Sequence, residues 1–268
     1  MDKPRIRCEI RDGIAEVMLT RGDKLNALDR AMFGAIDETL NQLARHKGLR
    51  AVILHGEGRA FCAGLDVKSM LRQPVAALDI LRREADEATN LAQRVAYGWH
   101  QLPVPVIAVT QGVCFGGGLQ IALGADFRFS TPDCRFSVME IKWGIIPDMS
   151  GSVTLRNLMG VDTAMELAMS GRELDAQEAR ALGLVSRVCE DPLDAAREFA
   201  RTLITKSPDA LAGIKQLYHQ AWARSDEVML KEETRLQQQI LGRPNQWRAT
   251  LNSLFRWRLP FGPRRNAL

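Results

Sequence analysis

Apolar residues along the chain follow two spacings, which predict two kinds of secondary structure. Residues 14–19, 51–55 and 105–109 are short, nearly continuous apolar runs, and such runs are typical of buried strands. After Asp29, apolar side chains instead recur every three or four residues, which predicts a helix with one buried face. That face carries Met32, Phe33, Ile36, Leu40 and Leu43.

The same two patterns continue through the middle of the chain. Residues 77–98 carry apolar side chains at helical spacing, and residues 127–129 and 135–138 are further short strands. Another helix is expected to begin at Leu119, directly after a triple glycine at 116–118. Strands that alternate with helices predict an α/β fold.

Beyond Asp148 the strand pattern fades and helices follow one another. Thr163–Glu166 and Asp175–Glu178 resemble capping boxes, in which the first side chain accepts a bond from the third residue of a helix. Gly171 and Gly183 stand where these two helices are expected to end, because glycine readily adopts the left-handed conformation of a helix terminus.

The loss of strand signal near residue 206 divides the chain into two expected parts. Residues 1–206 are predicted to form the α/β core, and residues 207–268 a helical region. The helical region has more apolar side chains than a thin layer over one side of a core requires, which predicts that it assembles subunits. These side chains include Leu230, Leu236, Ile240, Leu251 and Leu254.

Composition narrows the class of protein without identifying it. The 268 residues are 46% hydrophobic and 25% charged, as in ordinary globular proteins, and no apolar run approaches the roughly 20 residues that span a bilayer. The charged N-terminal segment lacks an apolar signal core, so a cytoplasmic location is expected. The five cysteines form no Cys-x-x-Cys pair, and none of the four histidines stands at metal-ligand spacing. We therefore expect no membrane association, no metal and no separate cofactor.

The positive charge of the chain is concentrated at its C-terminal end. Six arginines fall within the last 26 residues, in a chain whose net charge is +4. They form either a solvated helix and tail or a surface for an anionic partner. No aromatic stacking motif or recognition helix accompanies them, which argues against nucleic acid. The phosphates of a nucleotide-bearing substrate remain a possible partner.

Two glycine-containing loops, residues 60–67 and 116–118, each follow an apolar strand. Glycine lets the backbone approach a ligand closely, and the first amides of a helix are unpaired donors. Two such amides aimed at one oxygen would form an oxyanion hole. The alternatives are two tight turns or a phosphate loop, but the triple glycine lacks both the Lys-Ser/Thr of a P-loop and a dinucleotide fingerprint. No Gly-x-Ser-x-Gly motif of a serine hydrolase is present.

Taken together, several segments resemble the crotonase, or enoyl-CoA hydratase/isomerase, family over nearly the whole chain. In chain order these segments are residues 24–28 (Lys-Leu-Asn-Ala-Leu), 60–66 (Ala-Phe-Cys-Ala-Gly-Leu-Asp), 111–118 with 125–126, 136–140 (Phe-Ser-Val-Met-Glu) and 144–148 (Gly-Ile-Ile-Pro-Asp). The resemblance implies a spiral of ββα units with a helical C-terminal trimerisation region. It also implies a homotrimer or dimer of trimers, and a substrate carried as a thioester of coenzyme A.

The resemblance further implies roles for particular residues. By position, the amides of Leu65 and Gly117 would be the oxyanion donors, and Arg256 or Arg258 could contact a phosphate of coenzyme A. The backbone that would line the coenzyme A site lies at Lys24, Leu25, Ala63, Asp66 and Val67. A preorganised pair of amides suits thioester chemistry, because charge develops on the thioester oxygen in the transition state.

The candidate acid and base residues depart from the family's hydratase pattern. Hydratases that resemble this chain place one glutamate two residues after the triple glycine and a second at the position of Glu140, with water held between them. Here the first position is Gln120, which can hydrogen-bond a water but cannot exchange a proton. Glu140 lies in an apolar stretch, where an unpaired carboxylate without a function would be costly.

Asp148 is the second candidate acid, and two readings of it stay open. It follows Pro147 and precedes a predicted helix, so it is either a helix cap or a catalytic group. Dienoyl-CoA isomerases, hydroxyacyl-CoA hydrolases and aromatic-CoA dehalogenases of the family carry an acid here. None of these branches matches this chain at all three of the positions of Gln120, Glu140 and Asp148.

We expect an enzyme that stabilises a thioester enolate and moves the double bond of an enoyl-CoA, with Glu140 or Asp148 transferring the proton. The first alternative is hydration of a 2-enoyl-CoA by Glu140, with Gln120 orienting the water. Thioester hydrolysis is the next alternative. A non-catalytic scaffold that binds coenzyme A or RNA represents a different class, and the basic C-terminal end is its main support.

Overall fold

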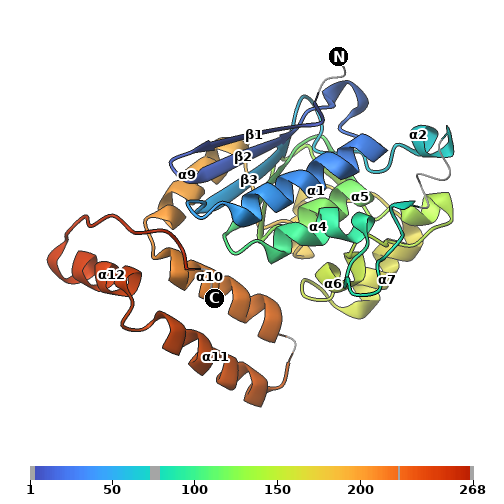
Figure 1. Cartoon of the computed structure of the whole chain (residues 1–268). Helices are drawn as coiled ribbons and strands as arrows, with labels where there is room; N and C mark the ends of the chain where they lie inside the picture. Colours follow the sequence, from blue (N-terminus) through green and yellow to red (C-terminus); the bar gives the residue numbers. More distant parts are fainter. Residues whose placement is uncertain (1–3, 73–78, 223, 266–268) are drawn as a thin grey trace.

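The computed structural model describes residues 4–72, 79–222 and 224–265, and these contain a mixed α/β fold (Figure 1). A six-stranded sheet has the order β1-β2-β3-β4-β6-β8, and a second sheet pairs β5 with β7. Only β1 and β2 run antiparallel; every other pair is parallel. The strands are β1 Ile6–Arg11, β2 Ile14–Leu19, β3 Ala51–Gly56, β4 Val106–Thr110, β5 Val113–Phe115, β6 Phe127–Ser130, β7 Arg135–Ser137 and β8 Arg187–Val188.

Helices cover the large sheet and extend from it at two ends. The short 3₁₀ segments are η1 Gly22–Lys24 and η2 Glu140–Trp143. The helices are α1 Arg30–Arg45, α2 Val67–Arg72, α4 Leu91–Gln101, α5 Gly117–Leu123, α6 Gly151–Leu155, α7 Val161–Ser170, α8 Ala176–Ala181, α9 Pro192–Ile204, α10 Pro208–Ala221, α11 Asp226–Ile240 and α12 Pro244–Phe255.

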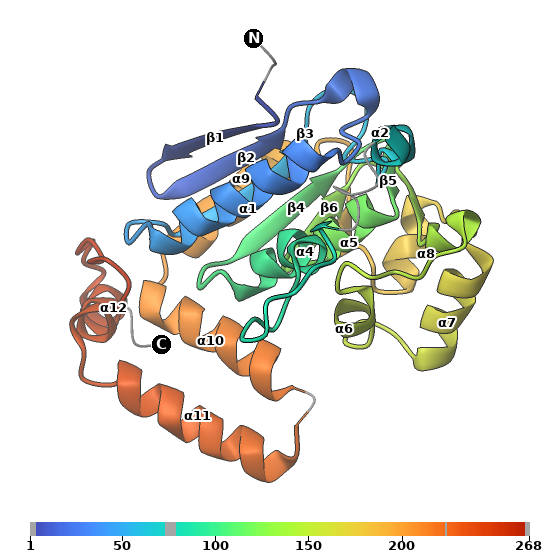
Figure 2. The ribbon, with the colours of Figure 1, turned by 45° about the vertical axis from the view of Figure 1, so that its right-hand side comes forward.

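The central strands are apolar throughout because both faces of the sheet are buried. In β3, Ala51 and Ile53 pack toward α9, whereas Val52 and Leu54 belong to the larger core on the opposite face. Figure 2 shows the sheet between α9 on one side and α1 on the other. The predicted helix after Asp29 is confirmed, since all five apolar residues of its expected face are buried and the Asp29 side chain caps α1.

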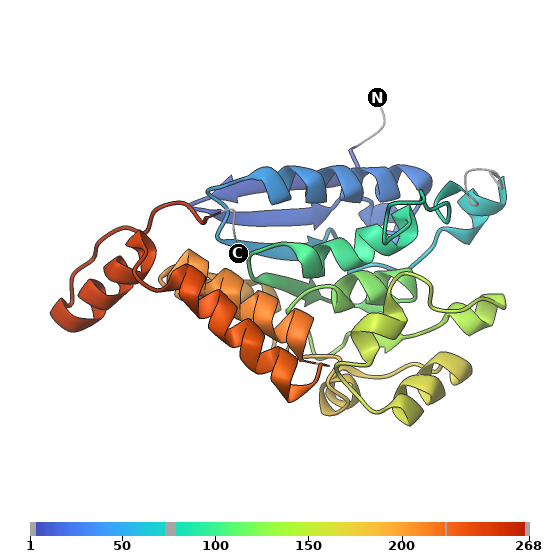
Figure 3. The same cartoon turned by 60° about the horizontal axis from the view of Figure 1, so that its bottom comes forward.

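The C-terminal helices leave the sheet and lie beside the core (Figure 3). Helix α10 begins at Pro208, where the Ser207 side chain caps it, and it packs against α11 and α12. The Lys215 ammonium fastens α10 to the core, because it donates to the carbonyls of Trp99 and Val104 and pairs with Asp126 at 2.8 Å. The division into 1–206 and 207–268 stays a prediction. None of the described helices is long and apolar enough to cross a membrane.

Two local expectations are wrong. Residues 81–90 are not helical; α4 begins only at Leu91, where Asn90 and Gln93 form a capping box, and residues 77–78 of the expected helix lie outside the described residues. Thr163 lies inside α7, whose N-cap is Gly160, whereas Asp175 does cap α8. A side-chain cap thus marks the beginning of α4 and of α8, whereas α7 begins after a glycine without one.

Candidate active site

The two glycine loops expected to form the site lie side by side. Cys62 donates its amide to Val113 at 3.1 Å and accepts from Phe115 at 3.0 Å, so the first loop runs parallel to β5. Gly64, at φ +86°, lies so close that an added Cβ would sit 2.8 Å from the Phe115 carbonyl oxygen and 3.5 Å from the Gly117 nitrogen. Only glycine fits this contact, which brings the segment before Leu65 against the start of α5.

Among the described residues, the amides of the two proposed oxyanion donors have no backbone acceptor. Leu28 donates to the Gly64 carbonyl at 2.8 Å and accepts from Asp66 at 3.0 Å, which is the pattern of a parallel bridge centred on Leu65. In such a bridge the central residue directs its own amide away from the partner strand. Gly117 is the first residue of α5, and its amide has no acceptor within the helix. Whether both amides reach one oxygen atom stays a prediction.

Most of the residues expected to line the coenzyme A site also lie next to the first glycine loop, residues 60–67. Ala63 donates to the Leu25 carbonyl at 2.9 Å, and the Lys24 side chain beside it is exposed. Asp66 and Val67 stand at the start of α2, next to the glycine loop. The Asp66 carboxylate is occupied by structure, because it accepts from the Ser69 amide at 3.0 Å.

Arg258 is not brought to this loop within the chain. It follows α12, which lies at the opposite end of the molecule from α2 (Figures 1 and 2).

A network around Arg21, which the sequence reading missed, holds the loops in place. The Arg21 guanidinium pairs with Asp66 at 2.8 Å and lies 3.4 Å from Asp29. Asn26 is fully buried, and its side-chain amide donates to the carbonyls of Glu57 and Ala60 at 3.0 and 2.9 Å. The sequence contains one sign of this network, because Asn26 is a polar residue between the apolar residues Leu25 and Ala27.

Gln120 forms the centre of the candidate acid–base site. Its side chain is buried, and Nε2 donates to Glu140 Oε1 at 2.6 Å. Its Oε1 accepts from the amides of Met149 and Gly151, each at 2.9 Å. One amide group thus orients the Glu140 carboxylate and also fixes the turn that carries Asp148.

Glu140 keeps one carboxylate oxygen free of protein partners. Its Oε2 is buried and has no hydrogen-bond partner among the described residues. Burial raises the pKa of Glu140, and the nearby charge of Asp148 raises it further, against the lowering effect of the Gln120 hydrogen bond. Glu140 is buried, as expected, but its apolar stretch is only partly enclosed, because Val138 is buried whereas Ile141 and Trp143 are exposed.

Asp148 does not cap the following helix. The N-cap of α6 is Ser150, in the left-handed conformation, and it has no side-chain cap. The Asp148 carboxyl is half-buried, and burial raises its pKa above the ordinary value. Of the two readings left open by the sequence, the helix cap is therefore wrong.

Comparison with known proteins agrees with this architecture and arrangement of loops. The family model for enoyl-CoA hydratase/isomerase matches residues 9–247. The 1,2-epoxyphenylacetyl-CoA isomerase of Escherichia coli is 31% identical over 258 residues, which cover 95% of this chain and 97% of that protein. EchA17 of Mycobacterium tuberculosis, described as a probable enoyl-CoA hydratase, is 35% identical over 205 residues, or 76% of each chain.

Solved structures of enoyl-CoA hydratases share the fold of this chain. An enoyl-CoA hydratase from Bacillus anthracis superposes with a TM-score of 0.86 at 25% identity, covering 96% of this chain and 98% of that one. One from Polaromonas gives 0.85 at 27% identity, covering 96% and 99%. Fold and loops thus define an enzyme of the class that acts on acyl-CoA thioesters. The chain belongs to the enoyl-CoA hydratase/isomerase, or crotonase, family.

Proposed function

We propose that this enzyme moves a double bond within an enoyl-CoA, and that Glu140 is its principal proton-transfer group. The observation that carries the proposal is the Gln120 amide. Gln120 uses both ends of its side chain on the protein, so the site has no second carboxylate at this position to hold a water opposite Glu140. A single carboxylate with one free, buried oxygen suits removal and return of a proton on one substrate.

The proposed reaction balances without any added reactant. The Glu140 carboxylate takes a proton from C2 of a 3-enoyl-CoA, and the electrons of the C–H bond move into an enolate on the thioester oxygen. The amides of Leu65 and Gly117 donate to that oxygen. Return of a proton to C4, from Glu140 or from Asp148, places the double bond between C2 and C3.

The proposal also covers where the substrate binds and how subunits assemble. The coenzyme A moiety would lie along the backbone of residues 24–25 and 63–67, and the acyl group would extend toward Glu140. The E. coli relative is named as an isomerase of an aryl epoxide thioester, which supports isomerisation as the reaction class and an aryl acyl group as one candidate. We also propose a homotrimer or a dimer of trimers, assembled through α10, α11 and α12.

Hydration of a 2-enoyl-CoA is the second candidate. Its support is Glu140 itself together with the description of EchA17 as a probable hydratase. In this reaction Glu140 alone would have to activate water, since Gln120 cannot exchange a proton. Thioester hydrolysis and binding without turnover are the remaining outcomes that an assay must separate.

The test is a substrate panel with product identification. The full-length protein is incubated with 2-enoyl-, 3-enoyl-, 3,5-dienoyl-, 3-hydroxyacyl- and 1,2-epoxyphenylacetyl-CoA, and the products are identified by mass and ultraviolet absorbance. Isomerisation leaves the mass unchanged, whereas hydration adds one water and hydrolysis releases free coenzyme A. The proposal fails if none of the thioesters yields a product of unchanged mass. Salt-sensitive RNA binding without turnover would instead favour the scaffold.

A further inference from the structure

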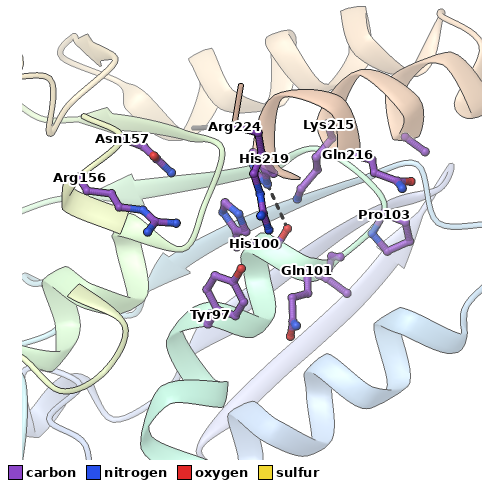
Figure 4. Close-up of a pocket in the computed structure, with 12 residues that line it drawn as sticks. Tyr97, His100, Gln101, Pro103, Arg156, Asn157, Lys215, Gln216, His219 and Arg224 are labelled. Atoms are coloured by element: carbon purple, nitrogen blue, oxygen red, sulfur yellow. Dashed lines mark hydrogen bonds between the residues drawn. The ribbon is translucent and has the colours of Figure 1, made fainter. Parts of the chain in front are cut away.

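A polar cavity of about 720 Å³ lies away from the glycine loops, between α4, α10 and the chain that follows α6. Figure 4 shows the side chains that line it, with Arg156 approaching from one side and the hydroxyl of Tyr97 from another. Its volume lies in the range of about 300–1,000 Å³ that is usual for small-molecule sites. The cavity is lined by several polar or basic side chains, which include Tyr97, His100, Arg156, Lys215, His219 and Arg224.

The cavity lies near the end of α5, whereas the glycine loops meet the beginning of this helix. Gly117 stands at the beginning of α5, whereas Asp126, just past its end, contacts two residues of the cavity wall. Seven helical residues span about 10 Å. A ligand in this cavity would therefore be distinct from the thioester at the glycine loops.

One wall of the cavity is a buried charged cluster. Asp126 lies 2.8 Å from Lys215 Nζ and 3.0 Å from His219 Nε2, while His219 Nδ1 lies 3.3 Å from the His100 carbonyl oxygen. The Asp126 carboxylate thus lies between the Lys215 ammonium and the His219 ring.

The second histidine adds a neutral, flat surface. The rings of His100 and His219 stack with centroids 3.5 Å apart and planes within 8° of parallel. Burial, followed by the charges of His219 and Lys215, lowers the pKa of His100 to about 3. His100 is therefore neutral near neutral pH, and its ring adds a flat, uncharged surface to the wall.

The rim of the cavity carries two guanidinium groups that no described carboxylate neutralises. Arg156 and Arg224 are both exposed, and neither forms an ion pair within the described part of the chain. Among the described residues no aspartate or glutamate lines the cavity, although the Asp126 carboxylate lies directly behind Lys215 and His219. Glu232, which Gln216 contacts at 3.4 Å, is already paired with Arg235. An anion at the rim would therefore meet Arg156 and Arg224, while the Asp126 carboxylate is paired with Lys215.

We propose that this cavity is a second binding site, for a small ligand that bears a phosphate or carboxylate group. The planar fork of an arginine side chain matches both oxyanions, and Arg156 with Arg224 would hold the group while Tyr97 and the stacked histidines complete the wall. The site goes beyond the proposed isomerase reaction and does not depend on it.

The two faces of α10 keep this site compatible with assembly of subunits. Ala212, Lys215 and His219 face the cavity. Ile214 and Tyr218 are exposed and follow the opposite side of the helix, where a second subunit can pack.

Binding is tested on the full-length protein without any acyl-CoA, by isothermal titration calorimetry in a buffer free of multivalent anions. Inorganic phosphate is the ligand in one arm and succinate in the other, which distinguishes a phosphate site from a carboxylate site. We expect saturable binding in at least one arm. The variants Arg156→Gln and Arg224→Gln should each weaken it by about tenfold, the usual worth of a charge-assisted hydrogen bond.

Arg180→Gln is the matched control, because Arg180 is another exposed arginine without a recorded ion pair, on α8 and outside the cavity. It should leave the affinity unchanged, and thermal unfolding should show all three variants folded. The proposal is overturned if neither ligand saturates, or if Arg180→Gln weakens binding as much as Arg156→Gln does. Because no thioester is present, neither result depends on the proposed isomerase activity.

Discussion

At the scale of single residues, the amide of Gln120 separates this site from one built on two carboxylates. A glutamine offers one acceptor and one donor group, and here the acceptor binds the Met149 and Gly151 amides while the donor binds Glu140. A glutamate at the same place could keep the first two contacts but would turn a second acceptor toward Glu140.

Gln120→Glu should therefore change both reactivity and stability. Two carboxyl groups in contact share a proton, which raises the apparent pKa of the pair. The variant should lose about 1–3 kcal/mol of unfolding free energy at neutral pH, the usual cost of an unsatisfied buried acceptor, and less in acid. Hydration of a 2-enoyl-CoA should rise relative to isomerisation. Urea unfolding at two pH values and product analysis measure the two effects; unchanged stability at pH 7 would contradict the contact.

Glu140→Gln should abolish most turnover without unfolding the protein. The new amide oxygen can still accept from Gln120, but it cannot take a proton, so kcat should fall by about 10²–10⁴-fold. Asp148→Asn, the matched neutral variant, should lose less activity. Steady-state kinetics with a 3-enoyl-CoA and a thermal unfolding curve check both. A Glu140→Gln enzyme with wild-type kcat would assign the proton transfer elsewhere.

The raised pKa of Glu140 also predicts how stability depends on pH. In the folded protein this carboxyl binds its proton more tightly than in the unfolded chain, whose value is near the ordinary 4.5. The associated stability is present below that value and is lost as pH rises through the higher folded pKa. Glu140→Gln lacks this loss, so its unfolding free energy relative to wild type should increase from acid toward neutral pH. A difference independent of pH would contradict the prediction.

Sequence reasoning reached these residues unevenly. It selected Glu140, Asp148 and Gln120 by position in a family pattern. It did not decide whether Asp148 caps a helix or acts in catalysis, and in the hydration alternative it assigned Gln120 the role of orienting a water. Both questions depend on contacts across about 30 residues, from Gln120 to Met149 and Gly151, which no local pattern contains. Arg21 and Asp66 are far apart in the sequence, so no local pattern predicts the ion pair that they form.

At the scale of elements, the buried strands were predictable because both faces of the sheet exclude water, and the starts of α1 and α8 were predictable from Asp29 and Asp175, which cap them. The helix expected at 77–98 was wrong because apolar spacing alone does not decide where a helix begins. The glycine loops are the elements on which the site depends, and their positions follow from close backbone contacts rather than from apolar pattern.

Gly64→Ala tests that dependence, with Gly242→Ala as its control. Both glycines have positive φ, so each alanine pays a backbone cost of about 1–2 kcal/mol. Only at Gly64 would the new methyl also meet the Phe115 carbonyl at 2.8 Å, whereas nothing lies within 4 Å at Gly242. Gly64→Ala should therefore lose more stability and most activity, as measured by urea unfolding and steady-state kinetics. Equal effects of the two changes would show that the contact between the loops is unimportant.

At the scale of the whole molecule, the C-terminal helices present apolar side chains to solvent. Leu230, Leu241, Trp247, Leu254 and Phe255 are all exposed in the single chain, although Leu236 of the expected set is buried within it. Exposed apolar area of this kind marks an interface. We predict that sedimentation velocity at micromolar concentration gives the mass of a trimer or hexamer of the 29.9 kDa chain. A monomeric mass would contradict the prediction.

The central claim is that one carboxylate, held by Gln120, transfers a proton on an enoyl-CoA without activating water. The most direct test is the ratio of two rates on thioesters of equal chain length, measured with the same wild-type preparation. These are isomerisation of the 3-enoyl-CoA and hydration of the 2-enoyl-CoA. We predict that isomerisation is the faster and that Glu140→Gln removes it. An enzyme that hydrates the 2-enoyl-CoA rapidly and leaves the 3-enoyl-CoA unchanged would contradict proton transfer by Glu140 without water activation.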